Sequence, residues 1–315
     1  MQQQVVALPD EADAVVLGAA GTGKTSVLVE LVAERVLTRG WDPGAIVAIA
    51  ASRRAAAALR DRIAARLGVV TPGPMARTAA SLAHGIVARA AAAAGDPPPR
   101  YVSGADHDRI VAELLAEEIE RDADGYWPAS IGRAVRGLAA FRSELRDFVA
   151  RATERGLRPE AIAALGAERD RPEWIAMSRF LPALAARIEL EHRGFTPLDS
   201  AYVLRRAAEL AAAGDPVAAG LRLVVVDDAQ ELGRGALELV RSLAAGGARV
   251  VALGDPDLAT GGFRGAAPGG FLEAAFWAAA GRPRPAPLVL PTAHRQTAGV
   301  RAALAAVTGA VGAAG

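Results

Sequence analysis

Cysteine and asparagine are both absent from the 315-residue chain, and only 4% of its residues are aromatic. The lack of cysteine excludes a disulfide framework, zinc knuckles and thiolate-held iron–sulfur clusters in this segment, and it suits a reducing cytoplasm. The first residues, M-Q-Q-Q, have neither the basic start nor the apolar core of a signal peptide, and no apolar run reaches membrane-spanning length. We therefore expect a soluble, cytoplasmic protein with no membrane partner.

The chain also has no excess of charge of one sign. It contains 36 Lys and Arg and 35 Asp and Glu residues, which gives a net charge of +1. Any surface that binds nucleic acid must therefore be local. Lysine itself occurs once, at Lys24, and every other Lys or Arg position is arginine. The planar fork of arginine does not replace a compact ammonium group. The single lysine is thus expected to serve a function that arginine cannot.

The segment around Lys24 has the spacing of a P-loop. An apolar run at residues 14–17 predicts a buried strand, and an amphipathic helix is expected over residues 26–38. Glycines let backbone N–H groups converge on an anion, and the helix N-terminus adds partial positive charge. Lys24 would reach the β- and γ-phosphates and the Thr25 hydroxyl would hold Mg²⁺, whereas the alternative is a flexible glycine turn. The nucleotide-binding residues are then Gly18, Ala19, Ala20, Gly21, Thr22, Gly23, Lys24 and Thr25.

Strand and helix signals alternate at both ends of the chain, which predicts an α/β fold with a parallel sheet flanked by helices. Between them, residues 101–196 lack strand signals and predict an all-helical insertion. Further strands are expected at residues 45–51, 75–78, 221–226, 249–253 and 288–290. Further helices are expected at residues 53–67, 79–94, 106–121, 131–155, 159–165, 173–193, 198–213, 235–245 and 271–279, with a last one at the end of the chain.

An acidic motif follows the strand expected at residues 221–226. Asp227 would emerge at the carboxyl end of a buried strand, where it could hold Mg²⁺ beside the P-loop. Asp228 is then the candidate general base for the attacking water, and Gln230 a γ-phosphate or coupling contact. A solvated Asp-Asp turn is the alternative, and Asp255, which also ends an apolar strand, is the second candidate for the magnesium ligand.

The order of these motifs resembles that of the UvrD/Rep/PcrA-type superfamily 1A DNA helicases, over essentially the whole chain. Gln2 stands where that family has the adenine-reading glutamine of its Q motif. The stretch G-D-P-D-L-A-T-G-G-F-R-G-A resembles motif III, and A-H-R-Q resembles motif IV. The matched segments are residues 18–25 (motif I), 46–62 (Ia), 77–84 (Ib), 196–210 (before motif II), 227–230 (II), 254–266 (III) and 293–296 (IV).

The resemblance implies a RecA-like P-loop NTPase sheet with an all-helical 1B insertion. It implies that Lys24, Thr25, Asp227 and Gln230 serve Mg·ATP, and that Arg264 and Arg295 contact the γ-phosphate. From spacing alone, either arginine would be assigned to the surface. The implied parts are domain 1A at residues 1–94 and 197–280, the 1B insertion at residues 95–196, and a truncated start of domain 2A at residues 281–315.

The implied activity is ATP hydrolysis coupled to translocation along single-stranded DNA and to duplex unwinding in repair or recombination, with 3′-to-5′ polarity. Candidate DNA contacts in the matched motifs are Ser52, Arg53, Arg54, Thr78 and Phe263. Solvated arginines at a helix N-terminus are an equal alternative for Arg53 and Arg54, and a core position is one for Phe263. Motifs V and VI are missing, so this segment should not translocate by itself.

Departures from the family pattern leave a second interpretation open. The catalytic glutamate is here Asp228, whose shorter side chain is expected to slow hydrolysis ~10²-fold. The motif III glutamine and tyrosine are Leu258 and Gly261, and aromatic positions of motifs Ia and Ib are alanine. The alternative is a degenerate motor subunit that binds ATP and supports an active partner. Residues 103–115 and 145–157 resemble actinobacterial helicase–nuclease subunits of the AdnA/AdnB kind, which adds a second subunit as a candidate partner.

Overall fold

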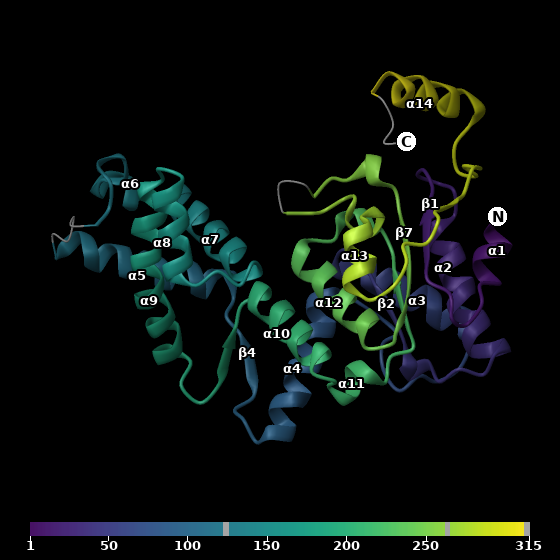
Figure 1. Cartoon of the computed structure of the whole chain (residues 1–315), viewed down its shortest axis with the longest axis horizontal. Coiled ribbons are helices and arrows are strands. Elements are labelled where there is room, and N and C mark those ends of the chain that lie inside the picture. The colour runs from purple at the N-terminus through teal and green to yellow at the C-terminus, as the bar shows by residue number, and fades with distance from the viewer. Residues whose placement is uncertain (122–125, 262–264, 312–315) are drawn as a thin grey trace. The chain divides into compact units, whose positions relative to one another are not determined.

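The computed structural model describes residues 1–121, 126–261 and 265–311. The chain divides into two compact units (Figure 1). We call them the sheet unit, which comprises Met1–Ile86 and Ala207–Gly315, and the helical unit, which comprises Val87–Arg206. The chain thus leaves the sheet unit once and returns to it once.

A six-stranded sheet forms the centre of the sheet unit, and all of its strand pairs are parallel. The strand order is β3-β2-β6-β7-β1-β8. The long strands read as continuous apolar runs because both of their faces are buried. The strands are β1 (Ala14–Leu17), β2 (Ile46–Ile49), β3 (Ala76–Arg77), β6 (Leu223–Val226), β7 (Arg249–Gly254) and β8 (Leu288–Val289).

Helices cover both faces of this sheet (Figure 1). One face carries α1 (Gln2–Val6), α2 (Lys24–Ala33) and α3 (Arg53–Leu67), whose apolar side chains share one core with β1, β2, β6 and β7. The opposite face carries α12 (Arg234–Ala245) and α13 (Ala274–Ala279). This arrangement confirms the predicted α/β fold with a parallel sheet between helices. The other helices here are α4 (Ala79–Ala94) and α10 (Ser200–Ala212), which the unit boundaries cross, α11 (Pro216–Ala219) and α14 (Ala298–Val311).

The helix after the P-loop differs from its predicted bounds. It begins at Lys24 rather than at residue 26, and it ends in a π-helical turn, Glu34–Thr38. Short 3₁₀ turns follow two strands, at Ala229–Glu231 after β6 and at Pro256–Leu258 after β7. Further 3₁₀ turns lie at Pro43–Ala45 and Gly270–Leu272.

The helical unit packs around its own apolar core. Phe180 and Leu145 are fully buried there, and Trp127 lies edge-on to Phe141 with ring centroids 5.7 Å apart. The predicted helix over residues 131–155 is interrupted, because Gly132 and Gly137 flank a short helical turn. The helices are α5 (Gly104–Glu120), α6 (Arg133–Arg136), α7 (Ala139–Glu154), α8 (Pro159–Glu168) and α9 (Pro172–Glu191), with a 3₁₀ turn at Ala129–Ile131.

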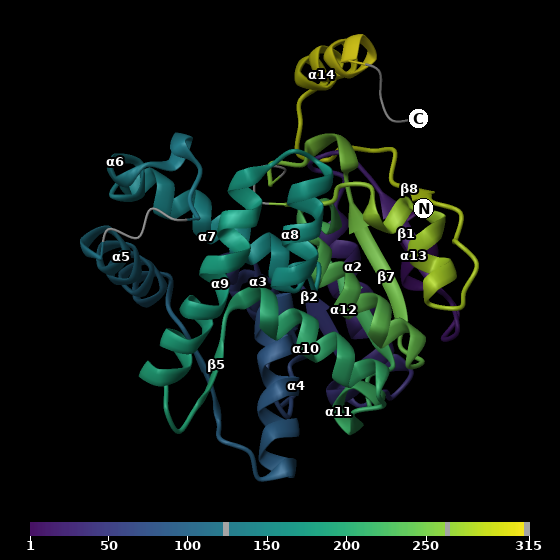
Figure 2. The same cartoon turned by 60° about the vertical axis from the view of Figure 1, so that its left-hand side comes forward.

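The prediction that this insertion is all-helical is wrong in one respect. Two short strands, β4 (Pro99–Tyr101) and β5 (Thr196–Leu198), pair in parallel where the insertion begins and ends (Figures 1 and 2). Both lie in proline-containing segments, and a residue that precedes proline favours extended backbone over helix. Each strand has only three residues, too few for a periodic signal, so neither was predicted although its proline disfavours helix. Within the described ranges, no helix is both long and apolar enough to cross a bilayer.

Candidate functional site

The candidate site lies at the carboxyl edge of the parallel sheet. The predicted P-loop, residues 18–23, follows β1. Asp227 follows β6, Asp255 follows β7, and residues 291–297 follow β8. Because β7 and β8 are the two neighbours of β1, these connections converge on the loop at residues 18–23. Ligands of open α/β sheets bind at this edge, where loops and helix N-termini meet.

The P-loop adopts a turn that its glycines permit. Gly21 and Gly23 have φ of +85° and +90°, a region that side chains with a Cβ rarely adopt. Gly23 is the N-cap of α2, so the first N–H groups of the helix face the loop. Lys24 folds back over the loop, and its Nζ donates to the carbonyl oxygens of Gly18 at 2.5 Å and Ala19 at 3.2 Å. The ammonium group therefore lies within the concave turn that would hold phosphates.

Thr25 and Asp227 are brought together from positions 202 residues apart. Thr25 Oγ1 donates to Asp227 Oδ2 at 3.0 Å and lies 3.3 Å from Oδ1. Asp227 is buried, and its backbone N–H donates to the carbonyl of Ile49 at 2.8 Å, which continues the β2–β6 ladder. Burial, together with the neighbouring carboxylate of Asp228, raises the pKa of Asp227 to about 6.

A hydroxyl and a carboxylate suit Mg²⁺, which protein sites hold through one or two carboxylates and the phosphates of a nucleotide. The residues that the structure describes contain no group of three or more His, Cys, Asp or Glu side chains that could hold a metal ion. The Thr25–Asp227 pair therefore fits a cation that arrives with its nucleotide. A bound cation would also offset the desolvation that keeps the pKa of Asp227 high.

Asp228 and Gln230 occupy different environments just beyond Asp227. Asp228 is exposed and has φ of +48°, in the left-handed region that an aspartate enters at a cost of about 1–2 kcal/mol. Gln230 is buried, and its Oε1 accepts from the backbone N–H of Asp255 at 3.0 Å. The Asp255 carboxylate accepts from the N–H of Asp257 at 3.2 Å instead of meeting Thr25. Gln230 thus joins the ends of β6 and β7, and of the two candidate carboxylates Asp227 is the one at the P-loop.

Sequence reasoning missed Glu231, which holds the loop after β7. Its Oε1 accepts from the N–H of Thr260 at 2.7 Å and from Thr260 Oγ1 at 2.9 Å. Gly261 lies so close that an added Cβ would stand 2.7 Å from Glu231 Oε2. The predicted site residues Phe263 and Arg264 lie outside the described residues. No sequence motif marked Glu231. Its partners, the backbone N–H and the hydroxyl of Thr260, are common groups that leave no distinctive pattern in the sequence.

The segment after β8 closes over the P-loop. The His294 backbone N–H donates to the Gly21 carbonyl at 2.9 Å, and Gln296 Nε2 donates to the Ala20 carbonyl at 3.2 Å. A Cβ on Gly21 would stand 3.0 Å from the Cβ of Arg295, so this contact needs glycine as well. The backbone of Arg295 therefore lies against the loop, and contact of its side chain with a γ-phosphate stays a prediction. The contacts of His294 and Gln296 were missed.

Gln2 approaches the same loop from the N-terminus of the chain. Its Nε2 donates to the Thr22 carbonyl at 2.9 Å and lies 3.4 Å from His294 Nε2. A Cβ on Gly23 would stand 2.8 Å from the same amide nitrogen. The site thus gathers residues from the start of the chain, from the P-loop and from the segment after β8.

Apart from Phe263, the residues predicted to contact DNA follow β2 and β3. Ser52 and Thr78 act as helix caps, since their hydroxyls accept from the N–H groups of Ala55 and Ser81 at 3.1 and 3.2 Å. Arg53 and Arg54 are exposed in the first turn of α3. These positions stay predictions of DNA contact, because a capped helix with solvated arginines explains them equally well.

Comparison with known proteins agrees with this arrangement. The model of the UvrD/REP helicase N-terminal domain matches residues 1–276. The chain is 24% identical over 280 residues to the ATP-dependent DNA helicase UvrD1 of Mycobacterium leprae. That match covers 84% of this chain and 34% of the relative, so the chain spans about a third of the relative's length. Because the family model covers most of the residues, the chain belongs to the UvrD/REP helicase family and carries its N-terminal domain.

Proposed function

We propose that the chain is the ATP-binding motor portion of an ATP-dependent DNA helicase. The observation that carries the proposal is the Thr25–Asp227 contact, which places a hydroxyl and a carboxylate beside the only lysine of the chain. Lys24 would neutralise the β- and γ-phosphates, and Thr25 and Asp227 would hold the Mg²⁺ that accompanies them. When bound, that ion would offset phosphate charge and orient the γ-phosphoryl group.

The other residues take the roles that the motifs of the family imply. Asp228, exposed next to the buried Asp227, is the general base, and Gln230 couples the site to the loop after β7 through its bond to the Asp255 N–H. Arg264 and Arg295 would stabilise charge on the γ-phosphoryl group. Gln2, whose amide lies at the P-loop, would read the adenine base. Ser52, Arg53, Arg54, Thr78 and Phe263 would contact single-stranded DNA.

The whole activity would be unwinding of duplex DNA in repair or recombination with 3′-to-5′ polarity, carried out in the cytoplasm by a longer assembly. A second helicase–nuclease subunit of the AdnA/AdnB kind is the proposed partner. The UvrD1 relative, which is named as an ATP-dependent DNA helicase, supports the class of activity.

Nucleotide titration tests the proposal directly. The chain is titrated with a fluorescent N-methylanthraniloyl derivative of ATP, with and without Mg²⁺, and the Lys24→Ala and Lys24→Arg variants are compared with it. Loss of a charge-assisted contact worth about 1.5–3 kcal/mol should weaken binding by roughly tenfold or more. Arg60→Ala, which removes an exposed arginine from α3, is the matched control. Equal affinity in Lys24→Ala and the unaltered chain would contradict the proposal.

A degenerate motor subunit is the second candidate, and Asp228 is the observation that favours it. The left-handed backbone and the short side chain of Asp228 set its carboxylate back from where a glutamate would reach. Leu258, which stands in the place of the family's motif III glutamine, is half-exposed at the end of a 3₁₀ turn. Such a subunit would bind ATP and support a partner without hydrolysing it fast.

The Asp228→Glu variant separates the two candidates. In the longest form of the protein that can be expressed, DNA-stimulated phosphate release is measured for the unaltered protein and for this variant. A large gain in the variant, about 10²-fold, supports the degenerate subunit, whereas fast release by the unaltered protein supports an active motor. Binding of the ATP derivative should be unchanged in both, which separates hydrolysis from nucleotide binding.

A further inference from the structure

We propose that Arg35 is a positioning residue for Gln2. By holding the segment that leaves α1, Arg35 keeps the Gln2 amide beside the P-loop and so sets the preference of the site for adenine nucleotides. This inference rests on the proposed function, because it takes Gln2 as the residue that reads the base.

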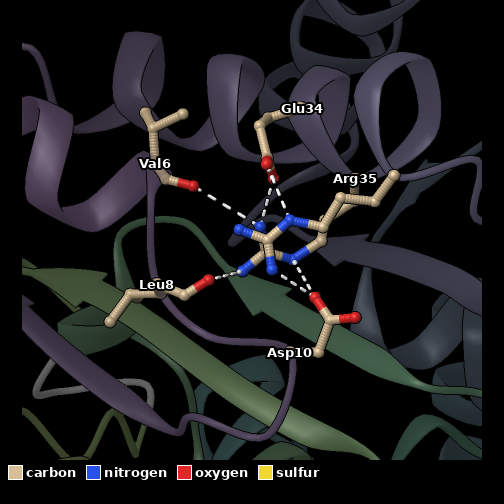
Figure 3. A network of polar contacts seen from close by, with 6 residues as sticks. Val6, Leu8, Asp10, Glu34 and Arg35 are labelled. Atoms are coloured by element: carbon tan, nitrogen blue, oxygen red, sulfur yellow. Dashed lines mark hydrogen bonds and ion pairs between the residues drawn. The ribbon is translucent and has the colours of Figure 1, made fainter.

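The Arg35 side chain lies in a buried polar cluster at the N-terminal corner of the sheet unit (Figure 3). Only 3% of it is exposed, although it carries a charge. Nη2 donates to the Leu8 carbonyl at 2.6 Å, and Nη1 lies 3.4 Å from the Val6 carbonyl. Nη1 also pairs with the Glu34 carboxylate, and Nε lies 3.8 Å from Asp10. We call Arg35 and these four partners the Arg35 clamp.

Only a guanidinium group can serve all of these partners together. Its five N–H donors lie in one plane and point in different directions, whereas an ammonium group is a compact point charge on a flexible stem. A buried charge is tolerated only where it is paired and hydrogen-bonded, and here both conditions are met. Two of the partners are main-chain carbonyls, that of Val6 at the end of α1 and that of Leu8 in the segment that joins α1 to β1. The clamp therefore fixes backbone, not only side chains.

That backbone determines where α1 lies. The helix has five residues, Gln2–Val6, and its one buried side chain is Val5, which enters the core shared with α2. A hollow of about 430 Å³ lies beside it, lined by Gln2, Val6 and Ala7 on one side and by Ser26, Glu30 and Glu34 on the other. Because Val5 is the one buried side chain of α1, the Arg35 clamp at Val6 and Leu8 carries much of the positioning of this helix.

Gln2 lies at the other end of the same short helix. At 1.5 Å per residue, the four-residue step from Gln2 to Val6 spans about 6 Å. Because α1 is this short, a displacement of its C-terminal end at the clamp also displaces the Gln2 amide at its N-terminal end. At that end the amide donates to Thr22 at 2.9 Å, directly beside the N-cap glycine of α2. Small movements at the clamp thus change the distance between Gln2 and the nucleotide site.

The test compares nucleotide preference rather than affinity alone. ATP and GTP compete with the fluorescent ATP derivative for the chain, and the ratio of their dissociation constants is measured for Gln2→Ala, Arg35→Met and the double variant. Loss of one or two hydrogen bonds to the base should reduce the ATP preference by about five- to tenfold in Gln2→Ala. Arg35→Met should reproduce most of that reduction, and the double variant should add nothing further.

Two gentler variants keep the test decisive if Arg35→Met does not fold. Arg35→Lys retains the charge but loses the planar set of N–H donors. Asp10→Asn removes the charge of one Arg35 partner, whose side chain is 36% exposed. Both should shift the ratio in the same direction by a smaller factor. Arg66→Ala is the matched control, because Arg66 pairs with Glu30 across an exposed surface and should leave the ratio unchanged.

The outcomes separate the inference from the function on which it rests. A chain that binds no nucleotide contradicts the proposed function itself. A chain that binds nucleotide, with the ATP preference unchanged in all folded Arg35 variants, overturns the inference alone. Equal weakening of ATP and GTP by Arg35→Met and Arg35→Lys would show that Arg35 serves only the stability of the site, and it would overturn the inference too.

Discussion

The Arg35 clamp of the sheet unit and the exposed ion pairs of α5 in the helical unit use the same residue types in different ways. In the clamp, one buried guanidinium serves two main-chain carbonyls and two carboxylates. Arg109 of α5 pairs with Glu113 at 2.8 Å and with Glu191 of α9, and Glu117 of α5 pairs with Arg187 of α9 at 2.7 Å, all partly or largely exposed. Arginine is thus a structural anchor in the first region and a solvated surface charge in the second.

Burial explains the difference. In water a salt bridge gains little, because each ion exchanges hydration for a screened attraction. Out of water, the same charge must be fully paired, and removing its partner leaves a large penalty. We therefore expect the helical unit to be stabilised by its apolar core and not by its exposed ion pairs, whereas polar contacts determine the geometry of the sheet unit's site.

Truncation of the helical core should have the largest effect. Phe180 is fully buried, and its ring centroid lies 6.0 Å from that of Trp127. Phe180→Ala should cost about 3–5 kcal/mol of the unfolding free energy, because apolar contacts are lost and a cavity remains. Hydrogen exchange with mass spectrometry would measure it, since α5, α7 and α9 should lose protection while β1, β6 and β7 keep theirs. Equal loss of hydrogen-exchange protection in both units would contradict the view that each unit is stabilised by its own core.

The charge of Asp227 should produce the next largest effect, with a size that depends on pH. Its pKa is raised from 3.8 to about 6 in the folded chain, so its contribution to stability is fully present below 3.8 and is lost as pH rises through 6. That shift corresponds to an upper limit of about 3 kcal/mol. In the absence of nucleotide and metal, Asp227→Asn should therefore be more stable than the unaltered chain near neutral pH.

Urea unfolding at about pH 4 and about pH 7.5 measures this difference. The advantage of Asp227→Asn should nearly vanish at the acidic pH, where the unaltered carboxyl is protonated. Asp61→Asn, at a carboxylate that is 70% exposed, is the control and should show no such pH dependence. A variant that is less stable than the unaltered chain near neutral pH would show that the Asp227 charge supports the fold instead of straining it.

The features that could be predicted from the sequence are those that a local pattern of residues marks. The buried strands β2, β6 and β7 were found because a strand covered on both faces needs a continuous apolar run. Lys24, Thr25 and Asp227 were predicted to lie near one another because the carboxyl ends of parallel strands share one edge of a sheet. These features are local patterns, and topology then brings them together.

The Arg35 clamp could not be found in this way. Its partners Val6 and Leu8 contribute carbonyl oxygens, which every residue has, and Arg35 itself is one of 35 arginines. The pairing of β4 with β5 was hidden because each strand has three residues and its partner lies almost 100 residues away. The break in the helix predicted at residues 131–155 had a signal, Gly132 and Gly137, that the helical periodicity around them outweighed.

The surface pairs of α5 should give the smallest effect. Arg109→Ala removes contacts to Glu113 and Glu191, yet nearly half of the Arg109 side chain is exposed, so water replaces most of what is lost. We expect the melting temperature to stay within error of the unaltered chain, at low salt and at about 0.5 M salt, where surface charges are screened. Thermal unfolding of Arg109→Ala beside Arg35→Lys makes the comparison within one experiment. If Arg109→Ala lowers the melting temperature as much as Arg35→Lys does, burial is not what distinguishes the two arginines, and the helical unit depends on its ion pairs as well as on its core.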